Sequence, residues 1–425
     1  MDLNKCMELF GTVKEYDSYL CGVKDDESKN LPLSDREDLR AAVKLISGCI
    51  YEIMPNKDIN MINLLSSEEP DFIFELREAL GEWITETERD LNSLSRCFIR
   101  LDHDFERMMH TVEKCSEEML MKRLLSVLGT FAEESSDNFR RLITVYNDFA
   151  HLWGGFDPAN GKYDHFINGI HAVKTDTDEI RWLYDTVEDY RSREVIYGLI
   201  RFWLDLDFSY KNSIKENNFN DYFDLDILKN KIDENEVFVD CGAYIGDTAR
   251  SYLKNFRNFR KMYLYDVVPA NLRKAKEELS GYEKIIYRNV GVGSPEQAGM
   301  KISVNDTETS TFSFGENGII HDPDSEGAET ADTKVEIVTI DNDIKEKISF
   351  LKMDIEGAET DALKGAQEHI VNDHPKLTIC AYHHYEHLWE IPALIRAMDS
   401  EYRLYLRYYG ATNGIMASEY VVFAV

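Results

Sequence analysis

The sequence has 425 residues and a formal net charge of −31, and 43% of its residues are hydrophobic. This length is too great for one ordinary hydrophobic core and suits two domains of roughly 150–250 residues. Both halves of the chain share the excess of acidic residues, so nucleic acid and anionic membranes are poor partners.

No stretch approaches the roughly 18 apolar residues of a membrane-spanning helix. The first ten residues, MDLNKCMELF, lack the basic start and apolar run of a signal peptide. The seven cysteines are scattered without a C-x-x-C pair, which favours free thiols in a reducing compartment and offers no zinc site. We therefore expect a cytoplasmic protein.

Residues 33–156 show the periodicity of amphipathic helices. Because no proline occurs between Pro70 and Pro158, nothing forces these helices to break. The pattern predicts an antiparallel helical bundle whose stripes form a core or a homodimer seam, the alternative being a partner-binding groove. The first stripe contains Leu76, Leu80, Trp83, Thr87, Leu91, Leu94, Phe98 and Leu101, and the second contains Phe105, Met108, Val112, Met119, Leu120, Leu124, Leu128 and Phe131.

The segment 154–161 holds three glycines, a proline and an asparagine, which is typical of a loop between domains. We assign residues 1–165 to an all-α helical domain of unknown role and residues 166–425 to a second domain. Residues 178–206 are again helical, with an aromatic-rich apolar face that we expect to pack on the second domain.

From residue 235 the periodicity changes to short β-rich runs that alternate with helical stretches. This alternation predicts an α/β fold with a parallel sheet covered by helices on both faces. The expected strands are 237–239, 261–265, 284–287, 335–340, 348–353 and 377–381, with 403–409 and 420–425 as a closing pair, and the expected helices are 270–280, 358–371 and 390–400.

The segment Val237–Thr248, VFVDCGAYIGDT, carries the sharpest functional signal. A strand ends at Asp240, and a glycine turn leads to a helix near Asp247. Gly242 and Gly246 permit positive φ angles and close approach of a ligand, and the helix N-terminus offers free N–H groups to a carboxylate. The spacing is G-x-x-x-G, whereas a dinucleotide site needs G-x-G-x-x-G. The unit favours S-adenosylmethionine, and the alternative is a tight strand–helix turn.

Asp266 follows the next expected strand, 26 residues after Asp240. An acidic residue at this place can accept hydrogen bonds from both ribose hydroxyls of a nucleoside. In register with the glycine loop, it strengthens the prediction of a nucleoside cofactor.

With these motifs, residues 190–425 resemble the FkbM family of S-adenosylmethionine-dependent methyltransferases. Where the family usually has Glu-Pro, this chain has Asp266-Val267, whose carboxylate is one methylene shorter. The matching segments are Asp240–Asp247, Asp266–Asn271, Asn289–Gly293, Val338–Asp341, Lys352–Glu359, Leu363–Ala366, Tyr382-His383 and Leu388–Pro392.

The resemblance implies a Rossmann-like, doubly wound, seven-stranded methyltransferase sheet with S-adenosyl-L-methionine as cofactor. It also implies O-methylation of a hydroxyl on a sugar or polyketide-like small molecule. The alternatives are an N-methyltransferase on a sugar amine or peptide, and a non-catalytic cofactor-binding scaffold. The expected cofactor-binding residues are Asp240, Gly242, Ala243, Tyr244, Gly246, Asp247, Thr248, Asp266, Asn289, Val290 and Asp354.

Methyl transfer to oxygen requires alignment of the acceptor and removal of its proton. His383 is the first candidate for the general base, because imidazole titrates near neutral pH. Asp354 is the second candidate, with orientation of cofactor or substrate as its other role. A structural histidine is the alternative for His383.

We assign no metal site, although Asp354, Glu356, Glu359 and His383 admit an alternative interpretation as a magnesium cluster. The simpler interpretation of Glu356 and Glu359 is a helix start whose acids complement the helix dipole. The polar insert 305–334 is either a surface loop or a lid that closes over the acceptor. Its candidate lid residues are Ser310, Thr311, Phe312 and Phe314.

Overall fold

The computed structural model describes residues 10, 83–84, 87, 99–217, 222–228, 235–256, 258–304, 333–410 and 415–425. The chain divides into two compact units, Met1–Met108 with Glu188–Glu194 and Met109–Val187 with Val195–Val425. In the described ranges, no helix combines the length and the apolar character needed to cross a membrane.

Most of the first predicted stripe lies outside the described residues, and so do Ser310, Thr311, Phe312 and Phe314 of the candidate lid. In the first unit, the rings of Phe10 and Trp83 lie 6.1 Å apart, and Arg193 pairs with Asp102 at 3.2 Å. The bundle predicted over the first part of the chain therefore stays a prediction.

The second predicted stripe is divided between two helices, although no proline lies between them. Residues 99–114 form one helix, and α5 (Glu117–Glu134) begins after a break, followed by α6 (Ser136–Asp148) and α7 (Ala150–Trp153). The hydroxyl of Ser116 accepts a hydrogen bond from the N–H of Met119 at 3.3 Å. This N-cap starts a new helix without any proline.

The predicted loop at 154–161 contains a small hairpin. Strands β1 (Phe156–Asp157) and β2 (Lys162–Tyr163) pair across the 3-10 turn η2 (Pro158–Asn160). Helix α8 (Asp164–Thr175) follows, so the predicted division at residues 165 and 166 falls inside a helix. That division stays a prediction about which part of the chain binds the cofactor by itself.

The helical stretch predicted over 178–206 is two helices, α9 (Thr177–Thr186) and α10 (Tyr190–Asp205), followed by α11 (Phe208–Ser213). The carboxylate of Asp189 accepts a hydrogen bond from the N–H of Ser192 at 2.8 Å. An aspartate at this position favours a new helix start over a continuous helix.

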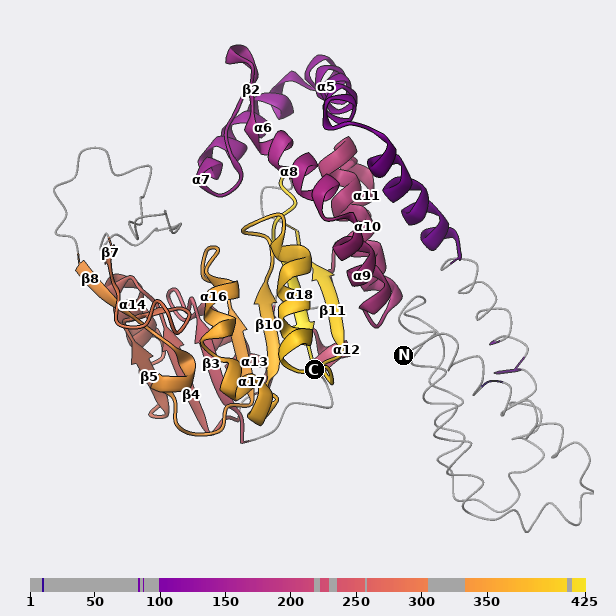
Figure 1. The fold of residues 1–425 in the computed structure, drawn as a ribbon. Coiled ribbons are helices and arrows are strands. Elements are labelled where there is room, and N and C mark those ends of the chain that lie inside the picture. The colour runs from indigo at the N-terminus through magenta and orange to yellow at the C-terminus, as the bar shows by residue number, and fades with distance from the viewer. Residues whose placement is uncertain are drawn as a thin grey trace, which may run out of the picture. The chain divides into compact units, whose positions relative to one another are not determined.

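A seven-stranded sheet forms the centre of the second unit (Figure 1). Its order is β11-β12-β10-β9-β3-β4-β5, in which β12 is antiparallel to both neighbours and the other pairs are parallel. The predicted fold class and the closing strand pair are thereby confirmed. The strands are β3 (Val237–Cys241), β4 (Lys261–Tyr265), β5 (Ile285–Arg288), β9 (Phe350–Met353), β10 (Lys376–Cys380), β11 (Leu404–Tyr408) and β12 (Tyr420–Ala424).

The run predicted over 335–340 does not join this sheet. It forms β8 (Thr333–Val338), which pairs with β6 (Gly291–Val292) and β7 (Lys301–Val304) in a separate three-stranded sheet. Val335 and Ile337 are buried, whereas Lys334 and Glu336, which alternate with them, are exposed. Such alternation is typical of a sheet with one solvent-exposed face, whereas fully apolar strands are typical of a sheet covered on both faces.

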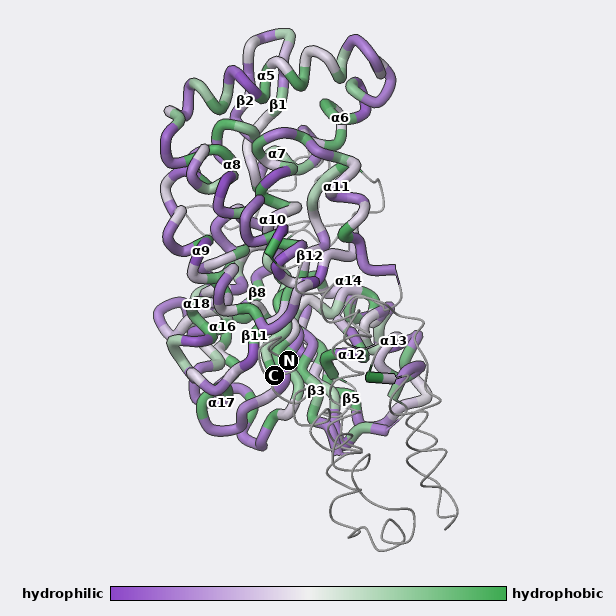
Figure 2. The backbone as a smooth tube through the Cα atoms, turned by 90° about the vertical axis from the view of Figure 1, so that its right-hand side faces the viewer, coloured by the Kyte–Doolittle hydropathy of each residue, from purple (hydrophilic) through white to green (hydrophobic). Residues whose placement is uncertain are grey.

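Helices pack against the central sheet. Side chains of α12 (Leu225–Leu228), α13 (Asp247–Phe256) and α14 (Pro269–Glu278) share one core with Phe238, Met262 and Phe350 of the strands. Helices α16 (Glu359–Lys364) and α17 (Gln367–Asp373) pack on α18 (His387–Met398), which contacts β12. Figure 2 shows the strands of this sheet as mainly hydrophobic.

The helix predicted over 358–371 is divided between α16 and α17 at Gly365. A Cβ atom on Gly365 would lie 2.1 Å from the carbonyl oxygen of Gly293, so the chain needs glycine at this close approach. The short helix α15 (Ile340–Asp343) precedes β9 and packs on α17.

Candidate functional site

The glycine loop between β3 and α13 has the backbone that its sequence predicts. Gly242 and Gly246 adopt φ angles of 80° and 78°. A Cβ atom on Gly242 would lie 1.7 Å from the carbonyl oxygen of Asp354, so no other residue fits. The loop therefore lies directly against the end of β9, and the start of α13 leaves backbone N–H groups for a ligand.

Asp240 lies beneath this loop and is fully buried. The Lys352 ammonium lies 2.9 Å from its Oδ1 atom and donates a hydrogen bond to the carbonyl oxygen of Gly242 at 2.9 Å. Burial raises the pKa of Asp240 to about 6, and Lys352 opposes this rise. The buried pair fixes the path of the glycine loop, and direct contact of Asp240 with a cofactor stays a prediction.

Asp266 follows β4 and is almost completely buried. Its carboxylate accepts hydrogen bonds from the N–H groups of Tyr244 (2.8 Å) and Val268 (2.7 Å) and from the Asn271 amide (3.3 Å). Burial raises the pKa of Asp266 to about 6, although these hydrogen bonds lower it. The short aspartate side chain thus holds its carboxylate against its own loop and that of Gly242.

The remaining predicted cofactor residues lie at the same edge of the sheet. Asn289 follows β5 and donates hydrogen bonds to the carbonyl oxygens of Asp266 (2.9 Å) and Val267 (3.0 Å). The carboxyl ends of β3, β4, β5 and β9 thereby meet, as expected for a ligand site in a parallel sheet. Tyr244 and Asp247 are exposed, Ala243 and Thr248 are buried, and Val290 follows Asn289 at partial exposure.

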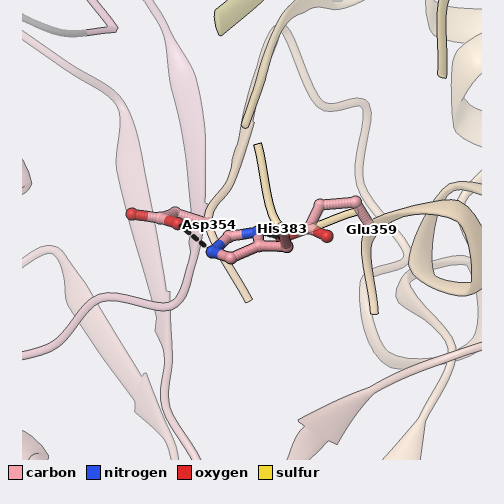
Figure 3. Close-up of side chains that lie close together, drawn as sticks. All are labelled: Asp354, Glu359 and His383. Carbon is pink, nitrogen blue, oxygen red and sulfur yellow. Dashed lines mark ion pairs between the residues drawn. The ribbon is translucent and has the colours of Figure 1, made fainter. Parts of the chain in front are cut away.

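Asp354 follows β9, and two tyrosines orient its carboxylate. The hydroxyl of Tyr222 donates to Oδ2 at 2.7 Å, and the hydroxyl of Tyr382 donates to Oδ1 at 3.1 Å. The Nε2 atom of His383 lies 3.5 Å from Oδ1 (Figure 3). The structure therefore brings together both predicted catalytic residues, His383 and Asp354.

His383 is fully buried among carboxylates. Its Nδ1 atom lies 2.9 Å from Oε1 of Glu359, and its Nε2 atom lies 3.3 Å from Oε2 of Glu356. Burial by itself lowers the pKa of His383, but the two glutamates outweigh burial and raise it well above its ordinary value. His383 is therefore an imidazolium at neutral pH. We call Asp354, Glu356, Glu359 and His383 the carboxylate cluster.

Glu359 is more than an acid at a helix start. It lies in the first turn of α16, is fully buried, and accepts a hydrogen bond from the N–H of Ile355 at 2.9 Å. Burial opposes its ionisation, yet His383 lowers the pKa of Glu359 to about 2. Glu356 has a left-handed backbone with φ of 56°, a strained conformation that such sites often retain.

A second group of side chains, the aromatic cluster, surrounds a small cavity next to Tyr382. Its members come from α6, α7, α8 and α10, from the segment after β10 and from β12, and they are Tyr146, Trp153, His165, Trp203, Tyr382, Tyr385 and Tyr420. The rings of Tyr146 and His165 lie 4.0 Å apart, and the indole N–H of Trp153 donates to the carbonyl oxygen of Tyr382 at 3.0 Å. The cluster connects the helices to the residue that holds Asp354.

Sequence reasoning missed three features of this site. The sequence pattern around Lys352 could have indicated its role, because a lysine inside an otherwise apolar strand needs a buried partner. No sequence pattern indicates the contact of Tyr222 with Asp354, because 132 positions separate the two residues. The aromatic cluster joins residues that are about 220 positions apart, such as His165 and Tyr385, and local patterns carry no such information.

Comparison with known proteins decides the family of this sheet. The family model described as the methyltransferase FkbM domain matches residues 240–411. These residues form a methyltransferase domain of the FkbM family. The match confirms the resemblance seen in the sequence and, with it, S-adenosylmethionine as the cofactor of this domain.

The methyltransferase FkbM of Methylobacillus flagellatus KT is similar in fold, with a TM-score of 0.50 and 22% identity over 62% of this chain and 63% of that one. An rRNA methylase from Streptococcus thermophilus aligns with a TM-score of 0.29 and 16% identity over 47% of this chain and 91% of that one. LepI in complex with SAM aligns with a TM-score of 0.27 and 14% identity over 91% of this chain and 99% of that one. No curated protein sequence matches the chain.

The methyltransferase domain fits its cofactor by the close approach at Gly242 and by the open start of α13. Which atoms of Asp240, Asp266, Asn289 and Val290 touch the cofactor stays a prediction. The same holds for the roles of His383 and Asp354 in the reaction.

Proposed function

We propose that the whole protein is an O-methyltransferase that uses S-adenosylmethionine and acts on a hydroxyl of a sugar or polyketide-like small molecule. When bound, the cofactor supplies a methyl group that its sulfonium already activates. The observation that carries the proposal is the contact between the cofactor loop at Gly242 and the end of β9, where Asp354 stands.

The acceptor class is supported by the resemblance to the FkbM family. The rings of Trp153, Trp203 and most tyrosines of the aromatic cluster are almost fully buried, and Tyr382 links them to the carboxylate of Asp354. The cluster would then help to hold Asp354 in place.

The charges around the two residues favour Asp354 over His383 as the group that takes the proton of the acceptor hydroxyl. An imidazolium has hydrogen on both ring nitrogens and has no lone pair to offer. Asp354 is 23% exposed, and its two tyrosine donors hold the carboxylate in place. His383 then acts as a cation that stabilises the ionised carboxylate.

The test uses the full chain, labelled S-adenosylmethionine and a panel of sugar and polyketide-like alcohols. We expect Asp354→Asn to lose about 10²–10⁴-fold in turnover at saturating S-adenosylmethionine, the usual size of proton-transfer catalysis. Asp185→Asn, an exposed change on α9, is the matched control and should keep full activity.

Other outcomes identify the alternatives. Product formed only from amines would identify an N-methyltransferase on a sugar amine or peptide. Cofactor binding without product from any acceptor would favour a non-catalytic scaffold. A loss of turnover in His383→Ala but not in Asp354→Asn would restore His383 as the base.

We also propose that residues 1–165 mediate a homodimer, supported by the apolar stripes of their sequence. A monomeric mass in solution at micromolar concentration would contradict this proposal.

A further inference from the structure

The carboxylate cluster gathers three carboxyl groups around one imidazole ring. Glu359 lies 2.9 Å from Nδ1 of His383, and Glu356 and Asp354 lie 3.3 Å and 3.5 Å from Nε2. The nearby Lys352 is already paired with Asp240. Carboxylate oxygens and an imidazole nitrogen are ligand types of divalent cations.

His383 supplies a second and independent observation. The imidazole is fully buried, yet neither ring nitrogen forms a hydrogen bond of ordinary geometry with the residues that the structure describes. Buried polar atoms in native proteins nearly always have partners, and the exceptions often mark an ion or a water. The distances to the glutamates and to Asp354 are those of ion contacts.

We propose that Asp354, Glu356 and His383 bind a divalent cation, which displaces the proton from Nε2 of His383. Cation–ligand distances of about 2.0–2.2 Å place neighbouring ligand atoms about 3.0–3.5 Å apart. The Nε2 atom of His383 lies 3.5 Å from Oδ1 of Asp354 and 3.3 Å from Oε2 of Glu356, which matches this spacing.

Glu359 has a different place in this site. The ligating atoms of Asp354, Glu359 and His383 all lie within 4.8 Å of one another, but Glu359 faces Nδ1 and Asp354 faces Nε2 (Figure 3). One cation contacts only one nitrogen of an imidazole. Glu359 is thus a positioning residue that orients the ring, as carboxylates behind metal-bound histidines commonly do.

The exposed side of the cluster agrees with this arrangement. The side chains of Asp354 and Glu356 are 23% and 31% exposed, so a cation can enter between them, whereas Glu359 is closed to solvent. Two carboxylates and one imidazole suit Mn²⁺, which accepts oxygen ligands and tolerates nitrogen. A cation there would lower the pKa of a hydroxyl bound to it, beside Asp354.

The inference is tested without cofactor or acceptor, so its failure is distinct from failure of the proposed function. The full chain is treated with a chelator, dialysed and titrated with Mn²⁺ alone, and free Mn²⁺ is measured by electron paramagnetic resonance. We expect one tightly bound Mn²⁺ per chain. Glu356→Gln should weaken its binding at least tenfold, and Glu359→Gln should weaken it about 10–100-fold.

Because the chain is strongly acidic, Glu277→Gln on the exposed face of α14 is the matched control and should bind Mn²⁺ like the wild type. Circular dichroism verifies the fold of each variant. Should Glu356→Gln fail to fold, Glu356→Asp replaces it with the same expected weakening, because its carboxylate is one methylene shorter. Equal binding by the Glu356 variant and the Glu277 variant would overturn the proposal, as would no tight binding in the wild type.

Discussion

Two buried histidines in the same compact unit differ in their charge. His165 lies in the aromatic cluster, where burial lowers its pKa to about 3, and it is therefore neutral. His383 lies in the carboxylate cluster, where Glu359 and Glu356 raise its pKa well above the ordinary value against the effect of burial. Burial is common to both residues, so the neighbours decide the charge.

The aromatic cluster and the carboxylate cluster also have different tasks in the site. The aromatic cluster packs buried rings together and keeps its histidine uncharged, as an apolar surrounding favours. The carboxylate cluster concentrates charge where the cofactor loop meets β9, which suits proton transfer and cation binding. Tyr382 contacts both, because its ring belongs to one cluster and its hydroxyl to the other.

Removing Glu359 should produce the largest change. Glu359→Ala leaves His383 without its closest carboxylate, and loss of one partner of a buried ion pair typically costs about 3–5 kcal/mol in the free energy of unfolding. Urea denaturation at pH 7 measures this cost. Glu277→Ala on α14 should change stability little, and a similar small loss for both variants would mean that His383 does not depend on Glu359.

The pH dependence of stability should show a smaller effect from His165. Below pH 6.5 the unfolded chain takes up a proton at His165, but the folded chain does not until about pH 3. The free energy of unfolding therefore decreases as the pH is lowered through this window. His165 accounts for a decrease of about 2 kcal/mol between pH 6.5 and pH 5. His165→Phe should remove this part of the slope in urea titrations at several pH values, whereas an unchanged slope would show that His165 is charged when folded.

The smallest effect should come from the contact between the helices and Tyr382. Trp153→Phe keeps an aromatic ring and removes the N–H that donates to the carbonyl oxygen of Tyr382. A lost hydrogen bond of this kind costs about 1 kcal/mol in the free energy of unfolding. If acceptor KM rises while cofactor affinity stays constant, the aromatic cluster belongs to the acceptor site. A rise in both would instead indicate a general loosening of the domain.

The local sequence pattern was sufficient to predict most strands of the central sheet. Four of its seven strands lie within the predicted runs, β3 extends two residues past its run, and β5 and β10 are each displaced by one residue. The agreement is close because a strand in a sheet covered on both faces needs a short, nearly continuous apolar run. The predicted strand at 335–340 was assigned to the wrong sheet, because local pattern predicts a strand but not its partner. The breaks at Ser116 and Asp189 depend on single capping hydrogen bonds that periodicity does not weigh.

The sequence by itself determined the glycine loop, the acid after β4, the family of the C-terminal part and thereby its cofactor, because these are contiguous motifs with fixed spacing. Only the tertiary structure decided the charge of His383, the pairing of Asp240 with Lys352 and the contact of Tyr222 with Asp354. The physical reason is that the charge of a buried group depends on neighbours within a few ångströms. The fold brings Lys352 to Asp240 and Tyr222 to Asp354 from positions more than 100 residues apart, and it brings Glu356 and Glu359 to His383 from the end of a different strand.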